Sequence, residues 1–136
     1  MVYLDTNVLI YACINQDDAK KMAKSQSIVR DLFETQDLIL SPISIQELIY
    51  TLSRLNISSQ QINDNYRFFK QFCVYGINVD IIDSAVELSL KLNLGKNIND
   101  IIHLKYAENY CSKLITFDND FKKLKEISSI EIQILE

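Results

Sequence analysis

The chain has 136 residues, the length of one domain, and can bury about two-thirds of the surface that the unfolded chain would expose. Hydrophobic residues make up 48% and charged residues 24%, as in ordinary globular proteins, and no apolar run reaches the roughly 20 residues of a membrane span. The net charge of −4 argues against a protein that binds nucleic acid by general electrostatic attraction. A cluster of metal-binding acids, however, would make the net charge more negative and still mark a site for an anionic substrate.

The cysteines and the first residues bear on the cellular compartment. The 3 cysteines, Cys13, Cys73 and Cys111, lie far apart, and an odd number cannot pair completely. They are best interpreted as buried thiols in a reducing compartment. The chain opens with an early aspartate and no basic leader, so no signal peptide is expected. We therefore expect one cytoplasmic domain over residues 1–136, with no membrane segment.

The first half of the chain predicts strands and helices in alternation. VYLD (2–5) has the character of a strand, and helices are expected over 6–14 and 17–35. DLILSP (37–42) predicts a second strand that its proline ends. A further helix is expected over 44–55, where apolar residues recur at helical spacing.

The second half predicts more elements of both kinds. Helices are expected over 58–75, 81–92, 100–111 and 120–125, and strands over 77–80, 113–118 and 130–135. Gly76 is expected to end the first of these helices and Gly95 to cap the second. Strands separated by helices predict an α/β fold with a parallel or mostly parallel sheet, flanked by helices on both faces, and the last strand at an edge.

Four acids are expected near the carboxyl edge of this sheet, where open α/β folds bind their ligands. Asp5 ends the first predicted strand, and Asp118 ends the strand KLITF. Glu47 lies one helical turn into the helix after the second strand, and Asp100 opens a later helix.

Each acid also has a possible structural role at the start of a helix. Asp5 is a candidate N-cap, Asp100 suits a first helical turn, and Asp118 suits a turn. Ser44 and Glu47 have the spacing of a capping box, which would bind Glu47 to the backbone. Capping explains any one acid more simply than catalysis does, but four acids at one edge favour a site. Clustered carboxylates need a counter-charge, and Mg²⁺ takes oxygen ligands and suits phosphodiester hydrolysis.

The segments that carry these acids resemble PIN-domain ribonucleases, a family that includes the VapC toxins of bacterial toxin–antitoxin pairs. The segments VYLDTNVLIY, ISIQELIY, INDIIHLKYAEN and LITFDNDF occur in the family's order and cover the chain from Val2 to about Leu124. The resemblance implies a PIN-like fold and an endoribonuclease that depends on Mg²⁺ or Mn²⁺. It also implies an RNA substrate, a small antitoxin partner and a homodimer. The alternatives are a non-catalytic PIN-like module that binds RNA or protein, and a housekeeping RNA-processing nuclease.

The same resemblance assigns roles to particular residues. By matching motif, the catalytic and metal-binding acids would be Asp5, Glu47, Asp100 and Asp118. Supporting hydroxyl and amide groups would come from Thr6, Asn7 and Thr116, and Asp120 is a possible extra acid.

The role of the only histidine, His103, stays open between a structural contact and support of the site one turn after Asp100. The lysines of KKMAK (20–24) and KKLK (122–125) are interpreted either as solvated helix faces or as contacts to RNA phosphates.

Overall fold

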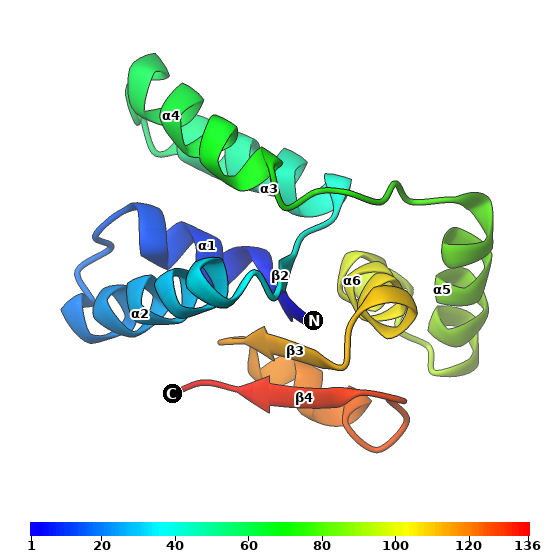
Figure 1. Cartoon of the computed structure of the whole chain (residues 1–136). Coiled ribbons are helices and arrows are strands. Elements are labelled where there is room, and N and C mark those ends of the chain that lie inside the picture. Colours follow the sequence, from blue (N-terminus) through cyan, green and yellow to red (C-terminus); the bar gives the residue numbers. More distant parts are fainter.

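The fold is built on a four-stranded parallel sheet. The computed structural model describes residues 1–136, except for the side chain of Lys96. The strands are β1 (Val2–Leu4), β2 (Leu38–Ile39), β3 (Lys113–Thr116) and β4 (Glu131–Ile134), in the order β2-β1-β3-β4 (Figure 1). All three neighbouring pairs are parallel, with Tyr3 aligned to Ile39 on one side and to Leu114 on the other. The predicted parallel sheet and the edge position of the last strand are confirmed.

Helical segments connect the strands. They are α1 (Thr6–Cys13), α2 (Ala19–Thr35), α3 (Pro42–Arg54), α4 (Ser59–Lys70), α5 (Val79–Lys91), η1 (Gly95–Asn97), α6 (Ile98–Tyr110) and η2 (Asn119–Leu124). Among the residues that the structure describes, none of the helices combines the length and the apolar character needed to cross a membrane.

Both faces of the sheet are covered, because side chains alternate along each strand. Tyr3 and Leu114 belong to a core with residues of α5, α6 and η2, whereas Leu4 and Ile115 belong to a second core with residues of α1 to α4. Each fully buried apolar side chain stabilises the fold by about 1.5–3 kcal/mol relative to an exposed one. This arrangement confirms the predicted helices on both faces.

The start of α3 differs from the prediction. The helix begins at Pro42, not at Ser44, and Ser41 is its N-cap in an extended conformation. Ser41 Oγ accepts from Ser44 N at 3.2 Å, and Ser44 Oγ accepts from Ser41 N at 3.4 Å. Proline suits the first position of a helix because its missing N–H is not needed there. The predicted Ser44–Glu47 capping box is therefore wrong, and the Glu47 side chain is free for other contacts.

Three further predictions fail between residues 70 and 95. INVD (77–80) is not a strand, because Asn78 caps α5 and its Oδ1 accepts from Ile81 N at 3.0 Å. Gly95 is not the C-cap of that helix. α5 ends at Lys91, and Asn93 takes the left-handed conformation with φ 55°, which asparagine adopts more readily than most residues. α4 also ends at Lys70, well before Gly76.

Candidate active site

Asp5 stands at the carboxyl end of β1, buried and held by several hydrogen bonds. Its side chain is the N-cap of α1, because Oδ1 accepts from the Thr6 backbone N–H at 2.8 Å. Oδ2 accepts from Thr116 Oγ1 at 2.7 Å and from Asn7 Nδ2 at 3.2 Å. Only 6% of the residue's surface is exposed. Capping and a position at the sheet edge are therefore compatible in this residue.

Asn7 and Thr116 join the ends of β1 and β3. Asn7 Oδ1 accepts from the Phe117 backbone N–H at 3.2 Å. Thr116 Oγ1 donates to Asp5 and accepts from the Asp118 backbone N–H at 2.9 Å. These side chains fix the positions of Asp5 and Asp118 relative to one another. Thr6 contributes its backbone N–H, while its buried hydroxyl has no hydrogen-bond partner among the described residues.

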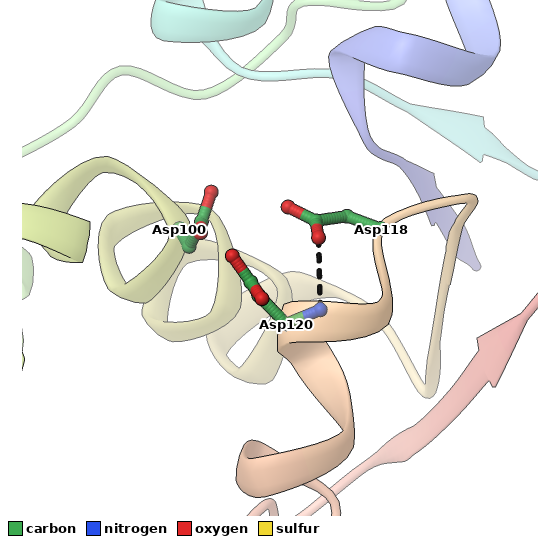
Figure 2. A group of neighbouring side chains, drawn as sticks. All are labelled: Asp100, Asp118 and Asp120. Carbon is green, nitrogen blue, oxygen red and sulfur yellow. Dashed lines mark hydrogen bonds between the residues drawn. The ribbon is translucent and has the colours of Figure 1, made fainter.

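Three carboxylates converge beside this junction. Asp118 is the N-cap of η2, with its Oδ1 accepting from Asp120 N at 2.8 Å. Asp100 lies in the first turn of α6. Each of Asp100, Asp118 and Asp120 offers an oxygen, and these oxygens lie within 4.8 Å of one another (Figure 2). The spacing and the hard oxygen donors suit a divalent cation such as Mg²⁺ or Mn²⁺.

The neighbouring acids shift the pKa of Asp100. Burial and the neighbouring carboxylates of Asp5 and Asp118 raise the pKa of Asp100 to about 6. Burial also raises the pKa of Asp5, against the lowering effect of His103 and of the hydrogen bonds from Thr116 and Thr6. Close, partly buried carboxylates thus resist being charged together, and a cation would relieve this repulsion.

Glu47 belongs to a different set of contacts at the same edge. Its Oε1 lies 2.6 Å from His103 Nε2, and the same ring nitrogen lies 4.0 Å from Asp5 Oδ1. Burial alone lowers the pKa of His103, but the hydrogen bond to Glu47 and the nearby carboxylates of Asp5 and Asp100 raise it above its ordinary value. Glu47 therefore faces the site from α3 while bonded to His103, outside the group of three converging carboxylates.

The structure thus divides the predicted site residues into two groups at the same edge. In the first, Asp100 and Asp118 converge with the extra acid Asp120, and Asp5 is joined to Asp118 through Thr116. The second is Glu47, which is bonded to His103. The sequence left the role of His103 open, and its contact to Glu47 depends on how α3 and α6 pack. The available signal was its spacing, because a residue three positions after Asp100 lies on the same side of a helix.

One lysine of the cluster KKMAK (20–24) lies near the same end of the sheet. Lys21 Nζ lies 5.2 Å from the centre of the Tyr11 ring and 5.3 Å from that of Phe117. Phe117 precedes Asp118, and its backbone N–H is bonded to Asn7. Cation–π contact therefore holds one positive charge of the first lysine cluster close to the β3 end.

A parallel α/β sheet with carboxylates gathered beyond its strand ends defines an α/β domain with a candidate metal centre. The sequence profile of the PIN domain matches residues 2–127. The chain therefore belongs to the PIN-domain family, in agreement with the resemblance of its four acidic segments.

Solved structures with this fold include proteins of toxin–antitoxin pairs. VapBC2 from Rickettsia felis, bound to a promoter DNA fragment, matches with a TM-score of 0.66 and 20% identity over 100% of both chains. VapC20 of Mycobacterium tuberculosis, a toxin that cleaves the sarcin–ricin loop, matches with a TM-score of 0.67 and 15% identity over 91% of this chain and 95% of that one. FitAcB from Neisseria gonorrhoeae matches with a TM-score of 0.67 and 16% identity over 98% and 96%. A comparison with curated proteins found no significant match.

Proposed function

We propose that this protein is a divalent-metal-dependent endoribonuclease that acts in the cytoplasm as the toxin of a toxin–antitoxin pair. The observation that carries the proposal is the convergence of Asp100, Asp118 and Asp120 oxygens within 4.8 Å, beside a buried Asp5. The raised pKa of Asp100 supports it, because repelling carboxylates are the donor set that a hard cation stabilises.

In this proposal the residues of the chain hold and orient the reacting groups. Asp100, Asp118 and Asp120 would hold Mg²⁺ or Mn²⁺, with Asp5 and Glu47 completing the acidic edge. Such a cation supplies the positive charge that phosphodiester hydrolysis requires at the scissile phosphate. Thr116 and Asn7 fix the orientation of the Asp5 carboxylate through the bonds that both donate to Oδ2.

The toxin role and the protein partner are inferred from the similar structures. VapBC2 and a toxin–antitoxin complex from Klebsiella pneumoniae share the fold with this chain. We infer that a small antitoxin blocks the acidic edge, with a basic side chain among the carboxylates, because arginine pairs well with them. A homodimer remains a prediction from the family resemblance.

The nuclease activity is tested by cleavage of a quenched RNA oligonucleotide. Cleavage should require Mg²⁺ or Mn²⁺, stop with excess EDTA, and disappear in the Asp5→Asn variant, which retains the N-cap of α1. Undiminished cleavage by the parent in excess EDTA would contradict the metal dependence, and cleavage by Asp5→Asn at the rate of the parent would contradict the role of this acidic edge. A folded parent that binds RNA without cutting it with either cation would indicate a binding module.

The toxin role needs a separate experiment in cells. Expression of the chain alone should stop growth, and co-expression of a small protein from the adjacent reading frame should restore it. The Asp100→Asn variant is the control, because it should be harmless without any partner. A parent that cleaves RNA in vitro but is harmless when expressed alone would indicate a housekeeping RNA-processing role.

A further inference from the structure

His103 is a buried polar residue that links the acidic edge to the interior of the molecule. It lies on α6 one turn after Asp100 and is 1% exposed. Its Nε2 lies 2.6 Å from Glu47 Oε1. An ionised carboxylate only accepts hydrogen bonds, so Nε2 carries the proton and donates to Glu47.

The other side of the histidine ring is held from within the core. His103 Nδ1 is hydrogen-bonded to the Tyr3 hydroxyl. That hydroxyl also lies 2.9 Å from Ser41 Oγ and 2.8 Å from Ser44 Oγ, the two side chains of the α3 capping box. A continuous set of hydrogen bonds thus runs from the N-terminus of α3, through Tyr3 on β1 and His103 on α6, to Glu47 on α3.

This arrangement fixes a side chain that would otherwise be mobile. Glu47 has three rotatable bonds and is 29% exposed, so without a partner it would sample several rotamers in water. The Tyr3 contact fixes the plane of the imidazole ring and thereby the direction of the Nε2–H. Groups that orient a metal-binding carboxylate or histidine in this way affect metal affinity without touching the metal.

We propose that His103 is a positioning residue that holds Glu47 in the orientation needed for divalent-cation binding, and that Tyr3 in turn orients His103. This inference rests on the proposed metal-dependent function. It assigns His103 no contact with RNA and no proton transfer in the reaction.

The test compares substitutions that retain different halves of the imidazole. Glutamine carries its amide nitrogen near the place of Nε2 and asparagine near that of Nδ1, so His103→Gln retains the donor to Glu47 and His103→Asn retains only the Tyr3 side. Mn²⁺ affinity is measured by calorimetry without RNA. We expect His103→Gln to stay within about threefold of the parent, and His103→Asn and His103→Ala to weaken binding roughly 10- to 100-fold.

Tyr106→Phe is the matched control for loss of a buried hydrogen bond on α6. Tyr106 is 0% exposed, and its hydroxyl donates to Leu40 O at 3.1 Å and to Tyr75 O at 2.6 Å. This variant should lower Tm without changing Mn²⁺ affinity. If all three His103 variants bind Mn²⁺ as the parent does, or if Tyr106→Phe weakens binding as much as they do, the inference is overturned.

A double-mutant cycle with Glu47→Gln tests whether His103 acts through Glu47. His103→Ala, or Tyr3→Phe if His103→Ala does not fold, should weaken Mn²⁺ binding in the parent but change it less than about twofold in the Glu47→Gln background. Equal losses in both backgrounds would overturn the inference. A parent that binds Mn²⁺ but does not cut RNA would remove the proposed nuclease and leave this cycle decisive. A parent that binds no Mn²⁺ would overturn both.

Discussion

At Asp100, burial and the carboxylates of Asp5 and Asp118 raise the pKa to about 6, whereas the same group in an unfolded chain titrates near about 4. Between about pH 4 and 6 the folded protein therefore binds a proton that the unfolded chain does not. This proton stabilises the fold, and the stabilisation is lost as the pH rises through that window.

The Asp100→Asn variant should therefore gain stability relative to the metal-free parent as the pH rises. A pKa difference of about 2 corresponds to about 3 kcal/mol before solvent screening, and a partly exposed side chain should yield ~1 kcal/mol, or ~4 °C in Tm, at pH 7.5. Thermal melts in EDTA from pH 4 to 7.5 measure the difference, which should be near zero at pH 4. A variant less stable than the parent at pH 7.5 would show that Asp100 acts mainly as a helix-terminal stabiliser.

Asp118 and Asp120 offer two acids where the family resemblance requires one. Both lie in the group of converging carboxylates, and asparagine at 118 retains the cap of η2. Asp118→Asn and Asp120→Asn should each weaken Mn²⁺ binding by about tenfold, or ~1.4 kcal/mol, and the double variant should bind none measurably. Calorimetry decides this. Unchanged affinity in Asp120→Asn would assign that acid to the surface.

At the scale of single elements, the residues at the start of α3 form both a helix cap and part of the buried hydrogen-bond network. Ser41 and Ser44 cap the helix and also contact the Tyr3 hydroxyl on β1. Ser58 caps α4 in a similar way, accepting from Gln61 N at 3.2 Å, but it is exposed and has no contact with the site. Comparing Ser41 with Ser58 therefore distinguishes an N-cap that also contacts the buried Tyr3 hydroxyl from an N-cap without such a contact.

Ser41→Ala should accordingly destabilise the protein more than Ser58→Ala does. Loss of an exposed cap costs about 1 kcal/mol, and Ser41→Ala should cost roughly 2 kcal/mol because it also removes a buried partner of Tyr3. Urea unfolding at pH 7.5 in EDTA gives both free energies of unfolding. Equal costs for the two variants would mean that the Tyr3 contact adds no stability.

At the scale of the whole molecule, the acidic edge joins segments from distant parts of the chain. Asp5 follows β1, Glu47 lies on α3, Asp100 on α6 and Asp118 after β3. A cation held between these elements would stabilise the folded state alone, because the unfolded chain does not bring the carboxylates together.

Mn²⁺ should therefore raise the Tm of the parent, and EDTA should reverse the rise. At a concentration 100 times the Kd the stabilisation is about 2.7 kcal/mol, which corresponds to a Tm rise of roughly 10 °C. Asp5→Asn and Asp100→Asn should lose most of this rise. Asp64→Asn, which changes an exposed acid on α4, should retain it. An equal Mn²⁺ effect in all four proteins would place the ion away from this edge.

The sequence by itself determined the parallel α/β fold and the edge that carries the acids. Apolar residues repeat at strand and helix spacing along the chain, and most of the predicted strands and helices form where these repeats lie. The two cores on the two faces of the sheet are built from these repeated apolar residues. The failures are local too. Asn78 caps a helix where the sequence suggested a strand, and Pro42 begins a helix where the sequence suggested the end of a strand, because short apolar runs do not distinguish strands from helices.

Only the tertiary structure decided how the acids are grouped. Whether Glu47 bonds to its own helix or to His103 depends on the packing of α3 against α6, since the two residues are 56 positions apart. Likewise, Asp120 joins Asp100 because η2 turns toward α6 after β3 (Figure 2). Spacing along the chain constrains neighbours within one helix or strand, whereas contacts between elements depend on side-chain packing across the whole core.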